Sequence, residues 1–240
     1  MKKLLLGNEA IARGAYEAGV RVSSAYPGTP STEINENVAT YPEIYSEWAP
    51  NEKVAVEVAL GAAVSGARSL ACMKHVGLNV AADPFFTATY TGVNAGMVVV
   101  VADDPGMHSS QNEQDTRMLA RASHAPVLDP SNSQECKDFL KLAYEISEKY
   151  DTPVILRVTT RIAHARTLVE LDERVEVPLR EYKRDIKKYV SMPANMIARH
   201  LYVEEREKKL AEDANTLPIN RIEWADRKIG VITSGAAYNL

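Results

Sequence analysis

The chain has 240 residues, of which 45% are hydrophobic and 25% are charged, as is typical of a folded globular protein. Its formal net charge of −4 argues against a nucleic-acid-binding scaffold. No apolar run is long enough to cross a membrane, and the two cysteines, Cys72 and Cys136, are too few for a disulfide framework or a cysteine-ligated metal site. We therefore expect a cytoplasmic protein without a membrane or nucleic-acid partner.

The first half of the chain alternates short apolar runs with helical patterns. Asn8 is suited to cap a first helix, which Gly19 would end. The four consecutive valines within residues 96–102 are the clearest buried strand. The other predicted strands cover residues 20–26, 44–48 and 69–73, and the predicted helices start near Ser31, run from 52 to about 66, and cover 76–90.

The second half continues the alternation and then changes in composition. Residues 127–128 and 153–158 are predicted strands, and the helix between them ends at Tyr150. Strands alternating with helices indicate an α/β fold with a mainly parallel sheet. We expect an α/β domain over residues 1–166, a charged linker with a helix (194–213) over 167–226, and over 227–240 the first strand of a second α/β domain, which would make the sequence a fragment of a longer polypeptide.

Three polar loops follow predicted strands and are candidates for chemistry. In an open α/β sheet, the loops after the strands build the ligand crevice. Arg117 is suited to hold a carboxylate in a bidentate fork. Ordinary roles stay open for all three: a proline-stiffened turn, a structural histidine and a solvated loop. A fourth stretch, residues 159–166, could place Arg161 or His164 at an interface or simply end a strand. The candidate residues are Gly28, Thr29, Lys74, His75, Gln111, Asn112 and Arg117.

Glu52 opens a helix that is otherwise almost wholly small and apolar. A carboxylate in a first turn is favoured by the helix dipole. On a rigid helix, beside an apolar surface that excludes water, the Glu52 carboxyl group could present a proton to a heterocyclic ligand. The alternative is that Glu52 only caps the helix.

Five motifs occur in one order along the chain: YPGTPSTE, NEKVAVEVALGAA, MKHVGLN, HSSQNEQDTR and TTRIAHAR. Together they resemble the N-terminal part of the alpha subunit of indolepyruvate:ferredoxin oxidoreductases, which are thiamine-diphosphate-dependent 2-oxoacid oxidoreductases. The resemblance is strong over residues 4–166. It implies that residues 1–166 are a pyrimidine-binding domain of the thiamine-diphosphate-binding fold.

The resemblance also implies roles for individual residues. Glu52 matches the glutamate that hydrogen-bonds the aminopyrimidine ring of thiamine diphosphate and donates a proton to its ring nitrogen. Gly28 and Thr29 are implied to bind the cofactor, and Thr29 also lies at the keto-acid site of related enzymes. Glu57 does not match, because it lies about 140° further around the helix. The substrate loops would contain His75, Gln111, Asn112 and Arg117.

The chain is expected to hold only half of a cofactor site and to be inactive alone. The motifs that bind Mg²⁺ and iron–sulfur clusters in the family are absent from the sequence, and we expect both groups in a downstream part or a partner chain. The implied partners are a diphosphate-binding domain of the same full-length chain or of a second copy, a beta subunit, ferredoxin and coenzyme A. A homodimer is also expected.

Two alternatives stay open at this stage. The substrate could be pyruvate or 2-oxoglutarate instead of an aryl-pyruvate such as indolepyruvate, with acyl-CoA as product in each case. The chain could also be a non-catalytic assembly domain of the same fold. An exposed apolar face around Ala55, Ala59 and Ala62 would suit either function.

Overall fold

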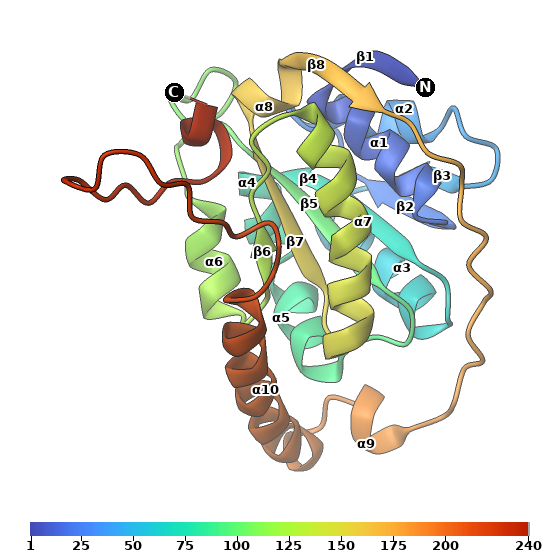
Figure 1. Cartoon of the computed structure of the whole chain (residues 1–240). Helices are drawn as coiled ribbons and strands as arrows, with labels where there is room; N and C mark the ends of the chain where they lie inside the picture. The colour runs from blue at the N-terminus through green and yellow to red at the C-terminus, as the bar shows by residue number, and fades with distance from the viewer. Residues whose placement is uncertain (240) are drawn as a thin grey trace.

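A parallel β-sheet forms the centre of the molecule (Figure 1). The computed structural model describes residues 1–239, and within them six parallel strands form one sheet in the order β3-β2-β4-β5-β7-β6. This confirms the predicted fold class. The strands are β2 (Val22–Ala25), β3 (Tyr45–Trp48), β4 (Ser69–Lys74), β5 (Met97–Asp103), β6 (Val127–Leu128) and β7 (Val154–Thr159).

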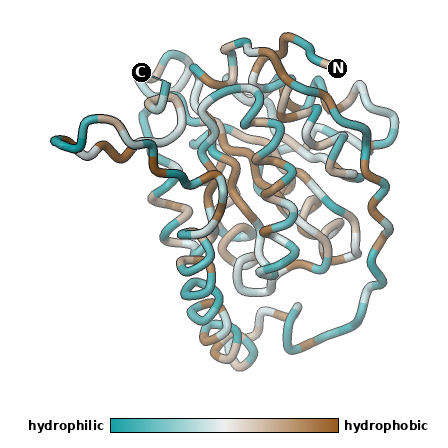
Figure 2. Tube along the Cα trace, in the orientation of Figure 1, coloured by the Kyte–Doolittle hydropathy of each residue, from teal (hydrophilic) through white to brown (hydrophobic). Residues whose placement is uncertain are grey.

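Two layers of helices cover this sheet, and Figure 2 shows the apolar strands enclosed between them. Alternate side chains of β4 point to opposite faces, so that Leu70 packs into one apolar cluster and Ala71 into the other. Both faces are buried, which explains the continuous apolar runs in the sequence. The first cluster includes residues of α1 (Gly7–Glu17), α2 (Thr32–Val38) and α7 (Ser133–Tyr150), and the second those of α3 (Glu52–Val64), α4 (His75–Val80), α5 (Ala82–Thr91) and α6 (Thr116–Ala122).

The region predicted as one helix over 76–90 is two helices, α4 and α5, with Ala81 between them. Pro84 lacks a backbone N–H and is tolerated only in a first helical turn, where those donors have no partner within the helix. A helix that contains Pro84 must therefore begin shortly before it, as α5 does. The continuous prediction was wrong for this reason.

The exposed apolar face predicted on α3 is also wrong in part. Ala55 and Ala59 are fully buried, and Ala59 packs in the apolar cluster on one face of the sheet. The exposed side of α3 carries Glu57 and Gly61 instead.

The N-terminus and the end of the domain form a second, two-stranded sheet. β1 (Lys2–Leu6) pairs antiparallel with β8 (Arg166–Glu170). Residues 159–166 therefore do not simply end a strand: α8 (Thr160–His164) lies between β7 and β8. The first helix begins at Gly7, after Leu6, so Asn8 is not its cap. Asn8 is buried instead, and its side chain donates to the Pro30 carbonyl (2.8 Å).

The charged segment after β8 runs along the outside of the domain to α9 (Ile186–Tyr189) and α10 (Pro193–Ala214), seen in orange and brown in Figure 1. The helix predicted over 194–213 is present as α10, which packs against α5. Its buried Arg206 donates to the carbonyls of Thr89 (2.9 Å) and Asp151 (3.1 Å). None of the helices within residues 1–239 is long and apolar enough to cross a membrane.

Residues 228–233 form no strand, contrary to the sequence pattern. Ile229, Val231 and Ile232 are exposed, and the short helix η1 (Gly235–Asn239) follows. A strand is stable only when its backbone groups pair with a neighbouring strand, and the described residues offer this segment none. The assignment of residues 227–240 to a second domain stays a prediction.

Candidate functional site

The predicted site loops lie together at the carboxyl edge of the sheet. Strands β2 and β4 are neighbours, although β3 lies between them in the sequence and outside them in the sheet. The chain thus reverses its direction of travel across the sheet between these two strands. Such a reversal opens a crevice beyond the strand ends, where ligands bind in open α/β sheets.

Glu52 lies at the first turn of α3 beside this crevice. It does not cap the helix, because the cap is Asn51, whose side chain accepts the Val54 N–H (3.0 Å). Glu52 is only 8% exposed, and its carboxyl group makes no hydrogen bond or ion pair with any described residue. It packs against Gly77 of α4: a Cβ atom added there would lie 2.5 Å from Glu52 Oε1.

Gly28 and Thr29 lie in the loop after β2. The Gly28 N–H donates to Thr32 Oγ1 and its carbonyl accepts from Ser31 Oγ, both at 2.8 Å, so the loop is a tight turn. A Cβ atom added to Gly28 would lie 3.0 Å from Lys74 Cδ, so this glycine lets the loop lie directly on the lysine side chain. Thr29 is exposed at the tip of the loop.

Lys74 and His75, which follow on β4 and α4, hold the polar loop that comes after β5. Lys74 Nζ donates to the Ser109 carbonyl (2.8 Å), and His75 Nε2 lies 3.0 Å from the Asn112 carbonyl. A carbonyl only accepts, so Nε2 carries a hydrogen atom in this contact. His75 is buried, and its Nδ1 atom has no partner among the described residues.

Two aspartates that the sequence analysis did not select fix the same loop. Asp103 accepts the Thr116 N–H (3.1 Å) and forms an ion pair with Arg157 (2.7 Å). Asp104 accepts hydrogen bonds from Ser109, Ser110 and Thr160 at 2.7–2.8 Å. The sequence feature that could have identified them is a pair of adjacent acids at the end of the most apolar strand.

The environment of Asp104 lowers its pKa. Burial alone would raise this pKa, but the hydrogen bonds from Ser109, Ser110 and Thr160 outweigh burial and lower it from 3.8 to about 2. Asp104 is therefore ionised at neutral pH.

Gln111, Asn112 and Arg117 are exposed. Asn112 reaches His75 through its backbone carbonyl only. The Arg117 guanidinium already holds Asp115, with Nη2–Oδ2 at 2.7 Å and Nε–Oδ1 at 2.9 Å. Arg117 also lines a cavity of about 1370 Å³ between α6, α7 and residues 207–238, which Glu52 does not line. The structure thus places Gly28 against Lys74, His75 directly after this lysine, Glu52 against Gly77 two residues further on, and the Arg117 guanidinium against Asp115.

No group of three or more His, Cys, Asp or Glu residues within residues 1–239 is arranged to hold a metal ion. The polar side-chain groups at this end of the sheet are the carboxyl group of Glu52, the imidazole of His75, the ammonium group of Lys74 and hydroxyl groups of the loop after β2.

Comparison with known proteins gives three findings. Residues 13–219 match the family described as "Pyruvate flavodoxin/ferredoxin oxidoreductase, thiamine diP-bdg". The chain is 49% identical over 247 residues to indolepyruvate oxidoreductase subunit IorA of Pyrococcus horikoshii and 49% over 241 residues to that of Methanothermobacter marburgensis. These matches cover 99% and 98% of this chain but only 38% and 39% of the relatives, so the chain spans about two-fifths of their length.

More distant matches share the fold. 2-Oxoglutarate synthase subunit KorA of Methanothermobacter thermautotrophicus is 31% identical over 180 residues, which are 71% of this chain and 48% of that subunit. The solved structure of 2-oxoglutarate:ferredoxin oxidoreductase from Magnetococcus marinus superposes with a TM-score of 0.72 at 20% identity, over 88% of this chain and 45% of that one.

Proposed function

Because the chain belongs to the thiamine-diphosphate-binding family of the pyruvate flavodoxin/ferredoxin oxidoreductases, we propose that it supplies the aminopyrimidine half of a thiamine diphosphate site. The complete enzyme would oxidatively decarboxylate aryl-pyruvates such as indolepyruvate to acyl-CoA, with ferredoxin as electron acceptor. The identity of 49% to the indolepyruvate subunits, against 31% to a 2-oxoglutarate subunit, favours the aryl-pyruvate substrate class.

The carboxyl group of Glu52, which has no partner among the described residues although the residue is only 8% exposed, carries this proposal. A polar group that is largely removed from water is stabilised by a hydrogen-bond partner. None of the described residues supplies one, and the carboxyl group lies in the space that Gly77 leaves. A flat ring nitrogen is the kind of partner that fits such a group, so the residues present fit an aminopyrimidine.

The chain's own groups would bind and orient the cofactor and hold a proton. Thiamine diphosphate, when bound, supplies the electron sink that decarboxylation of a 2-oxo acid requires. Glu52 would present a proton from its carboxyl oxygen to the ring nitrogen. Gly28 and Thr29 would form the neighbouring wall, and the loop held by His75 would close the substrate side, with Gln111, Asn112 and Arg117 on that loop and its flank.

The remaining components would come from outside this chain. We propose that a diphosphate-binding domain, of the same full-length chain or of a second copy in a homodimer, supplies the Mg²⁺ site. Iron–sulfur clusters would lie in a downstream part or a partner chain, together with a beta subunit. The protein is proposed to act in the cytoplasm.

The test is Glu52→Gln in the assembled enzyme. Loss of a general acid lowers kcat for indolepyruvate oxidation by roughly 10²–10⁴-fold. Glu57→Gln, which changes an exposed glutamate on the same helix, is the matched control and should leave kcat unchanged. Full activity of the Glu52→Gln enzyme would refute the catalytic function and favour a non-catalytic assembly domain.

A further inference from the structure

Lys74 is an almost buried cation without a carboxylate partner. The residue is 9% exposed. Its Nζ atom donates to one protein acceptor, the Ser109 carbonyl, and no carboxylate of the described residues lies within 4.0 Å. An ammonium group has three N–H donors, so two of them have no protein acceptor here. Burying a charge is costly unless an opposite charge compensates it.

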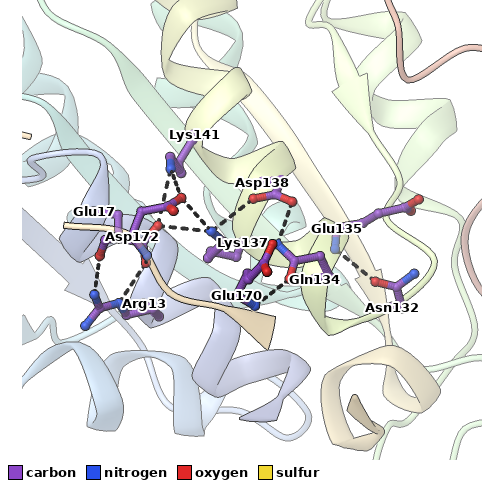
Figure 3. Close-up of polar contacts among 10 residues, drawn as sticks. All are labelled: Arg13, Glu17, Asn132, Gln134, Glu135, Lys137, Asp138, Lys141, Glu170 and Asp172. Carbon is purple, nitrogen blue, oxygen red and sulfur yellow. Dashed lines mark hydrogen bonds and ion pairs between the residues drawn. The ribbon is translucent and has the colours of Figure 1, made fainter. Parts of the chain in front are cut away.

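Among the described residues the other buried lysine, Lys137, has the carboxylate partners that Lys74 lacks. Lys137 is 1% exposed and contacts three carboxylates, those of Glu17, Asp138 and Asp172, at 2.9–3.2 Å (Figure 3). Arg157 is held by Asp103 and Asp129. Buried Arg206 has no ion pair with any described residue but donates to two backbone carbonyls, whereas Lys74 Nζ donates to one.

The acids next to Lys74 are already engaged. Lys74 pairs in register with Ala102 of β5, so Asp103 and Asp104 follow directly on the neighbouring strand. Asp103 is used by Arg157 and Thr116, and Asp104 by donors from its own loop and from Thr160. Neither forms an ion pair with Lys74.

Lys74 lies at the carboxyl end of β4, beside the candidate cofactor residues. Its side chain lies under Gly28, directly before the exposed Thr29. Three residues further along the chain, Gly77 contacts the Glu52 carboxyl group. Lys74 thus lies between the Gly28 loop and the α4 residue that contacts Glu52, whereas the Arg117 guanidinium is occupied by Asp115.

We propose that Lys74 binds the carboxylate of the 2-oxo acid substrate. This assignment rests on the proposed function and names the residue that recognises the acid group. The substrate carboxylate supplies the missing counter-charge, and the Ser109 carbonyl orients the ammonium group toward it. The carboxylate loses its charge as CO₂ leaves, so the ion pair belongs to substrate binding and weakens as the reaction proceeds.

The experiment compares Lys74→Met and Lys74→Arg in the assembled enzyme. A hydrogen bond to a charged group contributes about 1.5–3 kcal/mol, so Lys74→Met should raise KM for indolepyruvate by roughly 10–100-fold while kcat changes little. Lys74→Arg keeps the charge and should recover most of the affinity. The KM for coenzyme A should not change in either variant.

A binding measurement tests the same point without turnover. Wild-type enzyme should bind indole-3-propionate more tightly than indole-3-propionamide, which lacks the charge. Lys74→Met should abolish this preference. If the wild-type enzyme oxidises no 2-oxo acid, the proposed function fails, but this pair of probes still decides whether Lys74 recognises a carboxylate.

Thermal unfolding separates binding from a structural role. Lys74→Met should leave Tm unchanged or raise it, because it removes an uncompensated buried charge. Lys137→Met is the matched control: it removes one of the three cations that neutralise the fully buried Glu17 carboxylate and should lower Tm without changing the KM for indolepyruvate. A lower Tm or unfolding for Lys74→Met, an unchanged KM for the 2-oxo acid, or a raised KM for coenzyme A would each contradict the proposal.

Discussion

At the scale of single residues, the site depends on one contact between two helices. Glu52 begins α3, and Gly77 of α4 leaves the space in which its carboxyl group lies. The sequence predicts the position of Glu52, because an acid followed by small apolar residues is visible in one segment. It could not predict that Glu52 is buried or that Gly77 packs against it, because that contact joins residues from different elements.

Gly77→Ala should displace the Glu52 carboxyl group without unfolding the protein. The added Cβ atom would lie 2.5 Å from Oε1 and 2.6 Å from Cγ of Glu52, a side chain that can rotate away. Misplacing a catalytic group by about 1 Å costs on the order of 10²-fold in rate, so we expect kcat to fall by about this factor. Alanine is favoured over glycine in a helix by about 1 kcal/mol, so Tm should be unchanged or higher.

Gly61→Ala is the control for this variant. Nothing lies within 4 Å of a Cβ atom added to Gly61, so the change should raise Tm without moving Glu52. A Gly77→Ala enzyme with full kcat would show that the position of the Glu52 carboxyl group does not matter.

At the scale of elements, two adjacent aspartates at the end of β5 hold the polar loop at two points. Asp104 fixes Ser109 and Ser110, and Asp103 fixes Thr116 at the start of α6. The loop looked like a solvated surface segment in the sequence. Its side chains Gln111 and Asn112 are indeed exposed, but buried groups determine its path.

Asp104→Asn should reduce stability in a pH-dependent way. The folded-state pKa of Asp104, about 2, lies below its ordinary value of 3.8. The stabilisation is therefore present above about pH 4 and is lost as the pH falls toward 2; it amounts to about 2 kcal/mol. Urea unfolding at pH 7 should show this deficit for Asp104→Asn, and the deficit should shrink as the pH is lowered toward 3.

Asp83→Asn is the control for this prediction. Asp83 is 79% exposed and pairs only with Lys53 among the described residues, so its removal should change the free energy of unfolding by less than about 1 kcal/mol. A deficit for Asp104→Asn that stays constant from pH 7 to pH 3 would mean that lost packing, and not the lost charge, causes it.

The same scale shows which elements a sequence can predict. Strands β4, β5 and β7 are apparent because both faces of the sheet are covered and most of their residues are apolar. The β1–β8 pair was missed because it joins residues more than 150 positions apart and neither strand has a marked apolar pattern. Residues 228–233 have such a pattern, yet they form no strand, because pattern alone provides no pairing partner.

At the scale of the whole molecule, the chain is a folded α/β domain with a long charged segment wrapped around it. Ion pairs attach this segment at both ends: Asp172 binds Lys137 and Lys141 near α1, and Asp151 binds Lys188 and Arg199 near α5.

The structure of the assembled enzyme with thiamine diphosphate and Mg²⁺ would test the central claim most directly. The measurement is the distance from the Glu52 carboxyl oxygens to the nearest nitrogen of the aminopyrimidine ring. We predict a hydrogen bond of about 2.7–3.2 Å. A Glu52 side chain turned away from the ring, or another residue bonded to that nitrogen, would contradict the account.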